Sequence, residues 1–185
     1  MSITLIVLVG LLVIIGGWVM GTYNGFVVAR NKADEAESTM DVYLKKRYDL
    51  IPNIVETVKG YAKHEQETFE KVISARAKAI SSTSTEEKVE AEKELSGALG
   101  RLLAITEAYP DLKANVNFMD LQKELKVMEG EIANSRKYYN TIAMDYNNKI
   151  QIFPGNLLAG MFGFGKRPLY AVSDESEREN VKVAF

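Results

Sequence analysis

The chain has 185 residues, of which 46% are hydrophobic and 26% are charged, and its formal net charge is −2. This balance argues against the clustered excess of cations that binds nucleic acid, so no nucleic-acid partner is expected. Cysteine is absent, which excludes disulfides and thiolate metal sites. Only four prolines and long stretches rich in Glu, Lys, Ala and Leu favour an all-α chain.

The chain begins with an uncharged run, ITLIVLVGLLVIIGGWVM, from Ile3 to Met20. A helix needs about 20 mostly apolar residues to cross a bilayer, and Gly21 to Tyr23 can extend this run into the interface. We therefore predict a transmembrane anchor over residues 1–22, with membrane lipid as its partner. The residues that represent this anchor are Ile3, Leu5, Leu8, Leu12, Ile15, Trp18 and Met20.

Two alternatives exist for an apolar N-terminal run. A cleaved signal peptide is disfavoured because no basic residue precedes the run and no A-x-A site follows it. A buried core helix is disfavoured because every face of the helix is apolar.

The flanking cations predict the orientation of the anchor. Only Met1 and Ser2 precede the run, whereas Arg30 and Lys32 follow it closely. Positively charged flanks remain in the cytoplasm, so we expect a short N-terminus outside and the bulk of the chain inside.

The anchor is expected to continue as one helix to about residue 47, where three cations, residues 45–47, suit a helix C-terminus. The next stretch is DLIPNIVETVKGYAKHE. In it Asp49 is a candidate N-cap, and Pro52 falls in the first turn, where proline is tolerated. We therefore predict a second helix over residues 50–80.

Two more helices are expected after a loop at residues 81–85. Ser84 and Glu87 fit a capping box at the start of a third helix, which should end near Ala108. The fourth helix should run from about residue 117 to residue 152 and stop at Pro154. It carries an unbroken heptad seam: Phe118, Leu121, Leu125, Met128, Ile132, Ser135, Tyr139, Ile142 and Tyr146.

Four long helices with short loops indicate an antiparallel up-and-down four-helix bundle over residues 23–153. Because the second and fourth helices return over similar lengths, Phe153 should lie near the membrane again. An irregular C-terminal tail, residues 154–185, should begin with an apolar, glycine-rich part and end with a polar, extended one.

The apolar part of the tail is a candidate membrane-proximal segment, because apolar residues stand beside two cations there. The alternative is a tail packed on the bundle's own side. The residues concerned are Leu157, Leu158, Met161, Phe162, Phe164, Lys166 and Arg167.

Candidate catalytic or metal-binding groups are scarce. His64 is the single histidine, and its neighbours Glu65 and Glu67 are typical of a solvated surface. The sequence lacks G-x-x-x-x-G-K-[ST], G-x-S-x-G and H-E-x-x-H. We therefore predict no catalytic residue, metal or cofactor.

A repeated Tyr-Asn dipeptide is the remaining polar constellation. It occurs twice at a spacing of seven in the fourth helix and once just outside the anchor. The functional interpretation is a pocket for a small ligand or a lipid headgroup, and the alternative is a buried hydrogen-bond layer that fixes helix register. The layer comprises Tyr23, Asn24, Tyr139, Asn140, Tyr146 and Asn147.

Three long motifs resemble the LemA family of bacterial proteins: DVYLKKRYDLIPNIVETVKGYAKHE, EAYPDLKANVNFMDLQKEL and SRKYYNTIAMDYNNKIQIFPGNLLAGMFGF. The resemblance covers nearly the whole chain. It implies an N-terminal membrane helix and a cytoplasmic helical domain, and hence the bacterial cytoplasmic (inner) membrane, but no catalytic mechanism. Some relatives belong to magnetosome membranes, and the family is often linked with membrane peptidase and stress genes.

Three functions follow as hypotheses. The first is a non-enzymatic scaffold that forms a homo-oligomer, which the heptad seam and the small residues Gly10, Gly16, Gly17 and Gly21 favour. The second is an adaptor or regulator of a membrane peptidase or stress-response system. The third is a ligand or headgroup sensor that uses the Tyr/Asn layer.

Overall fold

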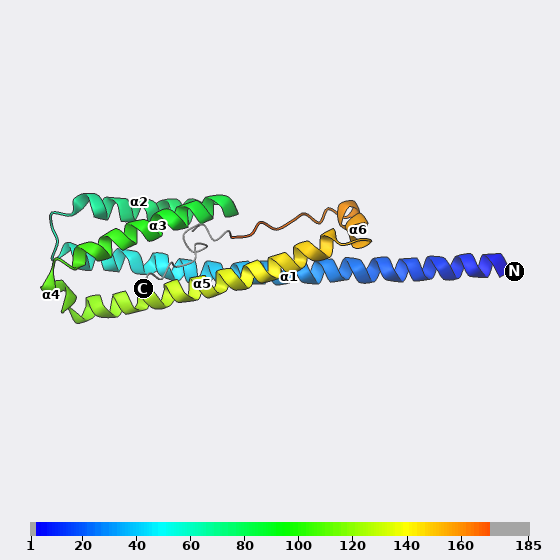
Figure 1. Cartoon of the computed structure of the whole chain (residues 1–185), viewed down its shortest axis with the longest axis horizontal. Coiled ribbons are helices and arrows are strands. Elements are labelled where there is room, and N and C mark those ends of the chain that lie inside the picture. Colours follow the sequence, from blue (N-terminus) through cyan, green and yellow to red (C-terminus); the bar gives the residue numbers. More distant parts are fainter. Residues whose placement is uncertain (1–2, 171–185) are drawn as a thin grey trace, which may run out of the picture. The chain divides into compact units, whose positions relative to one another are not determined.

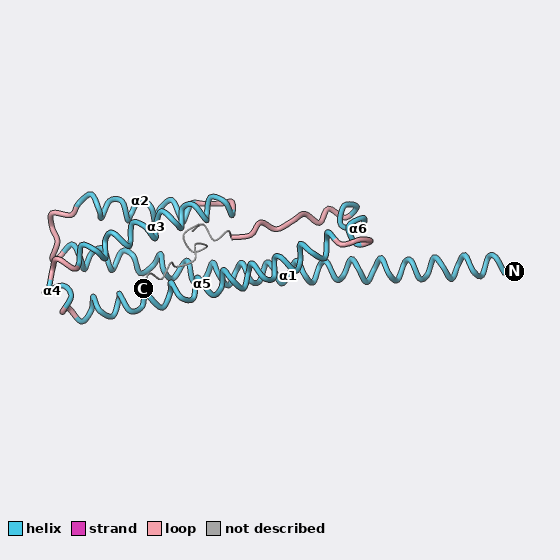
Figure 2. Tube along the Cα trace, in the orientation of Figure 1, coloured by secondary structure: helices cyan, strands magenta, loops and turns pink. Residues whose placement is uncertain are grey.

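The computed structural model describes residues 3–170, which form six helices and no strand (Figure 1, Figure 2). The all-α prediction is confirmed, whereas the predicted polar end of the tail, residues 171–185, lies outside the described residues. The helices are α1 (Ile3–Lys59), α2 (Gln66–Ser81), α3 (Thr85–Thr106), α4 (Pro110–Lys113), α5 (Val116–Gln151) and α6 (Gly155–Met161).

The chain packs as two compact units. Within the described residues, the first unit comprises residues 3–50 and 122–168, and the second comprises residues 51–121 and 169–170. Each unit is described by itself below. The proposed division into anchor, bundle and tail stays a prediction.

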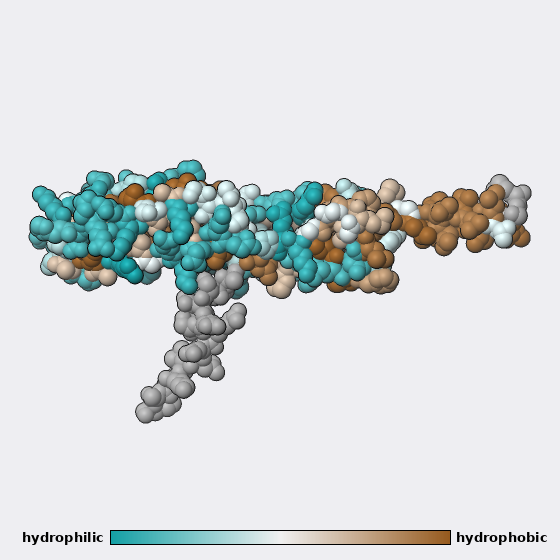
Figure 3. Space-filling view, turned by 90° about the horizontal axis from the view of Figure 1, so that it is seen from above, coloured by the Kyte–Doolittle hydropathy of each residue, from teal (hydrophilic) through white to brown (hydrophobic). Residues whose placement is uncertain are grey.

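In the first unit, the N-terminal part of α1 is apolar and unpacked. It is the one described helix long and apolar enough to cross a membrane, and none of its most apolar window is buried. This exposure contradicts the core-helix alternative. All seven residues named for the anchor are exposed, from Ile3 to Met20, and Figure 3 shows this apolar segment standing free of other side chains.

The predicted break between the first and second helices is wrong, because α1 continues through Asp49 and Pro52 to Lys59. Asp49 does not cap a helix; its carboxylate accepts a hydrogen bond from the Nζ of Lys45 at 2.7 Å, one turn earlier. A proline in a helix interior costs about 3 kcal/mol. Burial of the apolar residues beside it outweighs that cost: Leu50, Ile51, Ile54, Val55 and Val58 are all buried.

The turn lies instead at residues 60–65. The backbone N–H groups of Tyr61 and Ala62 both donate to the carbonyl of Val58, which closes α1. His64 is exposed in this turn, as expected of a surface histidine. The predicted helix over residues 50–80 is therefore the end of α1, a turn, and α2.

In the second unit, α2 and α3 lie antiparallel and side by side (Figure 1). The predicted capping box at the start of α3 is confirmed, since the hydroxyl of Ser84 accepts from the N–H of Glu87 at 3.1 Å and the Glu87 carboxylate accepts from the N–H of Ser84 at 3.2 Å. The Nζ of Lys78 on α2 donates to the carboxylate of Glu94 on α3.

Helix α5 follows the prediction to within one residue at each end. The side-chain oxygen of Asn115 caps it by accepting from the N–H of Phe118 at 3.0 Å. Every residue of the heptad seam is buried or half-buried, so the seam is the packed face of α5.

Two short helices, α4 and α6, were not predicted from the sequence. Helix α4 starts with Pro110 at its first position, where a missing N–H costs nothing. Helix α6 occupies the part of the tail that was expected to be irregular. Both are too short to show a hydrophobic period in the sequence.

Substitution of Asp49 tests the corrected boundary. Asp49→Ala should lower the free energy of unfolding by at most about 0.5 kcal/mol, because it removes only an exposed ion pair within one helix. Ser84→Ala, which removes a true N-cap, should cost about 1 kcal/mol. Chemical unfolding of the detergent-solubilised protein measures both. A larger loss of unfolding free energy for Asp49→Ala than for Ser84→Ala would instead support a helix start at Asp49.

Candidate functional site

Helix α6 packs on α1 and α5 at the base of the apolar run. Buried Leu158 and Ala159 form one cluster with four residues of the longer helices, and Val19 and Phe164 pack against it. The α1 and α5 members are Phe26, Ala29, Tyr146 and Ile150. Helix α6 thus contacts the apolar run, to which Val19 belongs, while the expectation that Phe153 lies near the membrane stays a prediction.

Two glycines make this packing feasible. At Gly155 an added Cβ would lie 3.1 Å from the Cζ of Phe26, which is tighter than ordinary contact. Gly163 has φ +71°, a conformation that glycine adopts without strain. It turns the chain after α6 so that the N–H of Phe164 donates to the carbonyl of Ala159 at 2.9 Å.

The turn at Gly163 places Phe162 and Phe164 against α1. The ring of Tyr23 meets both of them edge-on, with centroids 5.0 and 5.6 Å away, and Phe26 meets Phe164 at 5.3 Å. The guanidinium carbon of Arg30 lies 5.4 Å from the centroid of Phe164. An aromatic cluster with a cation at its edge therefore joins the tail to the anchor's base.

Beyond this cluster, α5 holds the segment 165–168 by its backbone, and we call this arrangement the clamp. The hydroxyl of Tyr146 donates to the carbonyl of Gly165 at 2.9 Å, and that of Tyr139 donates to the carbonyl of Pro168 at 3.0 Å. Asn147 makes a paired contact with Arg167: its amide donates to the Arg167 carbonyl, and its oxygen accepts from the Arg167 N–H, both at 2.8 Å. These hydrogen bonds from α5 involve only backbone groups of residues 165–168, so they do not depend on the side chains of that segment.

Helix α1 completes the clamp through charge. The guanidinium of Arg167 donates to the carboxylate of Asp34 and lies 3.5 Å from a carboxylate oxygen of Glu37. The Arg167 side chain is 29% exposed, so this ion pair is partly shielded from water. One residue of the tail thus contacts α1 through its side chain and α5 through its backbone.

Three of the predicted polar-layer residues come together, and three do not join them. Tyr139, Tyr146 and Asn147 form the clamp, where their hydroxyl and amide groups bond the chain's own backbone. Tyr23 packs in the aromatic cluster, and Asn24 is exposed. Asn140 is half-buried on α5.

The candidate membrane-proximal residues divide between two surroundings. Leu158 is buried, and Phe164 is half-buried in the aromatic cluster, whereas Lys166 is exposed. Leu157 and Met161 remain in solvent, and Phe162 is about half exposed although its ring meets Tyr23. One part of the tail thus packs on the chain's own helices, and another part presents an apolar surface.

Sequence reasoning missed Asp34 and Glu37, and it did not assign Gly155 and Gly163 a role in packing. The acids stand about 130 residues from Arg167 and look like ordinary charges on an exposed helix face. The glycines had a signal, because Pro154-Gly155 and the pattern F-G-F-G mark chain turns.

Burial raises the pKa of Tyr139 and of Tyr146 above the ordinary tyrosine value. For Tyr139 the carboxylates of Glu37 and Asp34 add to the rise, while Arg167 opposes it. For Tyr146 the cations Arg167 and Arg30 oppose the rise. Both hydroxyls therefore stay protonated, as hydrogen-bond donors, throughout the neutral range.

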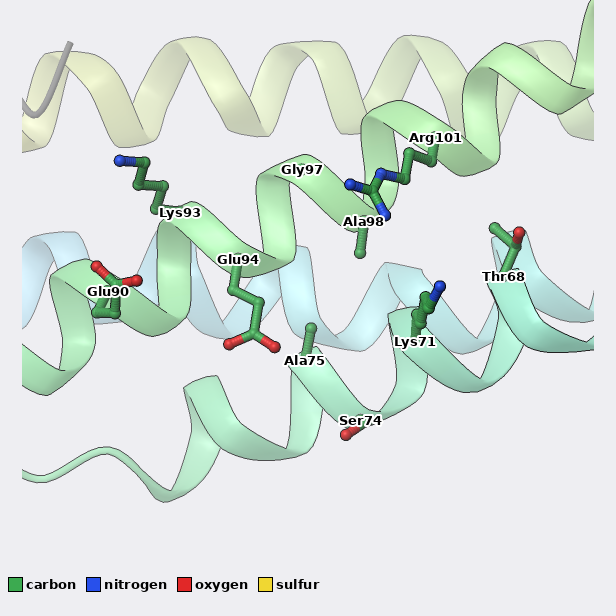
Figure 4. Close-up of a pocket in the computed structure, with 10 residues that line it drawn as sticks. All are labelled: Thr68, Lys71, Ser74, Ala75, Glu90, Lys93, Glu94, Gly97, Ala98 and Arg101. Atoms are coloured by element: carbon green, nitrogen blue, oxygen red, sulfur yellow. The ribbon is translucent and has the colours of Figure 1, made fainter. Parts of the chain in front are cut away.

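A hollow of about 540 Å³ lies in the second unit, between α2 and α3 (Figure 4). Lys71, Lys93 and Arg101 stand on its walls together with Glu90 and Glu94. Its lining thus carries charges of both signs beside small residues such as Ala75, Gly97 and Ala98. We assign it no chemistry. Within residues 3–170, no cluster of three or more acidic or histidine side chains is arranged to hold a metal.

The comparisons with known proteins agree in one family. The family model of the LemA family matches residues 36–185. Protein LemA of Metamycoplasma hominis is 30% identical over 170 residues, which cover 89% of this chain and 74% of that protein.

Magnetosome proteins are also similar. Magnetosome protein MamQ 2 of Paramagnetospirillum magneticum is 26% identical, over 80% of this chain and 64% of its own length. Magnetosome protein MamQ of Magnetospirillum gryphiswaldense is 27% identical, over 77% of this chain and 62% of its own length. The chain therefore spans somewhat less than two thirds of the magnetosome relatives. None of these names denotes an enzyme.

Substitution of Asn147 tests the clamp. Asn147→Ala removes both hydrogen bonds to the Arg167 backbone and leaves that N–H and carbonyl unpaired, at a cost of about 2 kcal/mol. Amide hydrogen exchange at Arg167 should accelerate at least about tenfold. The control is Asn148→Ala, at an exposed position on the same turn of α5. Equal exchange rates in the two variants would contradict the clamp.

A second prediction concerns alkaline pH. Because folding raises both tyrosine pKa values, the unfolded chain loses these protons first, at about pH 10. Stability from the two hydroxyls is complete below that pH and is lost as pH rises through the raised folded-state values. The double variant Tyr139→Phe/Tyr146→Phe should therefore lose less unfolding free energy than the wild type between about pH 9 and pH 11. Urea unfolding at a series of pH values gives the dependence of the unfolding free energy on pH for each protein. If both proteins lose unfolding free energy equally as pH rises, neither hydroxyl contributes to stability.

Proposed function

The chain belongs to the LemA family, and we propose that it is a membrane-anchored, non-enzymatic scaffold that associates with copies of itself. The observation that carries this proposal is α1. Its unpacked apolar part continues, without a break in the helix, into a part that packs with α5 and α6. A rigid connection of this kind holds a folded domain at a set distance from the bilayer.

The hydrogen bonds of the Tyr/Asn layer favour a scaffold over a ligand sensor. The hydroxyls of Tyr139 and Tyr146 and the side-chain amide of Asn147, three of the six groups proposed for a ligand, are hydrogen-bonded to backbone groups of residues 165–168. A ligand would have to displace the chain's own tail to reach them. Relatives that are named for the magnetosome support a role in organising a membrane. An association with a membrane peptidase stays a prediction.

We place the anchor in the bacterial cytoplasmic membrane, with the short N-terminus outside. This orientation rests on the cations that follow the apolar run, Arg30 and Lys32.

The apolar run itself offers a contact surface for self-association. At about 100° per residue, Gly10, Gly17 and Gly21 fall on one face of α1, whereas Gly16 lies about a third of a turn away. A Cβ added at any of the four would meet nothing within 4 Å. In lipid, such small-residue faces let two helices approach closely, and Gly17 and Gly21 have the spacing of a G-x-x-x-G pair.

Glycine substitution tests self-association. Gly17→Ile/Gly21→Ile should leave the fold unchanged and lower the oligomer-to-monomer ratio by roughly tenfold, or about 1.4 kcal/mol, because the branched side chains would keep the two helices apart. Energy transfer between labelled copies in lipid vesicles measures that ratio. Gly16→Ile, on a different face, is the matched control and should retain the wild-type ratio. A wild-type protein that is monomeric in vesicles would refute the proposal.

A further inference from the structure

The chain that leaves α5 presents a group of large apolar side chains to solvent. Ile152 and Phe153 are 64% and 74% exposed, and Leu157 and Met161 on α6 are 59% and 77% exposed. Single exposed apolar residues are common, but four within ten positions form a patch that calls for a partner. The opposite face of α6 is already buried on α1 and α5 through Leu158 and Ala159. Helix α6 is therefore apolar on both sides.

The position of this patch along α1 identifies its surroundings. Phe153 and Ile152 line one groove, of about 360 Å³, together with Trp18 and Thr22 of α1. Val19 packs against the cluster that holds Leu158. Helix α6 therefore lies at the level of the last turn of the apolar run, and Figure 3 shows apolar side chains gathered beside the base of the free segment.

Helix length gives the depth. Twenty residues, from Ile3 to Thr22, span about 30 Å at 1.5 Å per residue, which is the thickness of the hydrocarbon core. If Ile3 lies at one boundary of that core, the other boundary falls near Thr22. Side chains packed at the level of Trp18 to Phe26 then lie in the headgroup and acyl boundary. The apolar face of an interfacial helix typically enters this boundary by about 5–10 Å.

The charges around the patch fit the same depth. Lys149 lines the groove that contains Trp18 and Phe153, and Arg30 lies beside the ring of Phe164. Aromatic rings with cations close by are typical of the headgroup level, where anionic lipid attracts the cations.

We infer that Ile152, Phe153 and α6 form a second membrane contact, an interfacial foot whose exposed apolar face lies among the lipids of the leaflet from which α1 emerges. The occupant is lipid and not a second copy of the chain, because the patch continues directly from the transmembrane run. This inference rests on the proposed anchoring of α1. It adds that the tail is held at the membrane surface.

Tryptophan quenching by brominated lipid tests the foot in the full-length protein. Trp18 is the single tryptophan, so Trp18→Phe gives a dark background for Met161→Trp. Vesicles contain phosphatidylcholine brominated high in the acyl chain together with phosphatidylglycerol. Emission from Met161→Trp should shift to the blue and be quenched several-fold.

The matched control is Val127→Trp in the same background. Val127 is also an exposed apolar residue of the first unit, 50% exposed, but it lies about 38 Å along α5 from Ile152. Its emission should be that of a water-exposed ring and should not be quenched. Circular dichroism of each variant verifies that helix content is retained.

Two outcomes would overturn the foot, and a third would overturn its premise. Emission from Met161→Trp that matches Val127→Trp would place the patch in water. Blue-shifted emission without quenching would place it against protein, such as a second copy. In the otherwise unaltered chain, the emission of Trp18 reports on the anchor. If Trp18 is quenched and Met161→Trp is not, the anchoring stands and only the foot is refuted. If Trp18 is not quenched, the anchoring itself is refuted.

Discussion

The contact between α6 and the base of α1 is the interaction on which the first unit depends. Val19 and Phe26 of α1 meet Leu158 and Ala159 of α6 in one apolar cluster. Burial of four such side chains contributes several kcal/mol, at about 1.5–3 kcal/mol for each large one. The close approach requires glycine at position 155, because a Cβ there would crowd the ring of Phe26. Beyond Gly163 the chain runs back along α1 and α5, where residues 165–168 contact both helices.

The clamp uses that route and differs from the cluster in its chemistry. Its hydrogen bonds run from side chains of α5 to the backbone of residues 165–168, so they stabilise an extended conformation whatever its sequence. Sequence specificity enters through Arg167, whose guanidinium reaches two carboxylates on α1. An exposed ion pair stabilises a protein only slightly. These charges, however, lie in a partly buried site together with the hydroxyls of Tyr139 and Tyr146, where electrostatic interactions are stronger. The tail is therefore a structural part of the first unit and not an appendage.

Periodicity predicted the long elements well, because burial decides their sequence. The heptad seam of α5 is the packed face of that helix, and Ser84 caps α3 as its spacing with Glu87 indicated. The prediction failed where a local rule met tertiary packing. Asp49 and Pro52 form a good helix start by themselves, yet burial of Ile51, Ile54 and Val55 keeps the helix unbroken. The sequence predicted only the α5 residues of the clamp, through the Tyr-Asn repeat. No local pattern distinguishes Asp34 and Glu37, its residues on α1, from other surface charges.

A single transmembrane helix fixes the depth of a protein but leaves it free to rotate about the helix axis and to tilt. A second contact on one side of that helix removes much of this freedom, and α6 lies on one side of α1 at the level where lipid headgroups would begin. The glycine face of the apolar run and the interfacial foot would then point in fixed directions relative to each other, because the foot packs on the helix that carries the glycines. Copies that meet through the glycine face would consequently present their packed domains in a defined orientation, which is the physical requirement for a scaffold that builds an ordered assembly and not a random cluster.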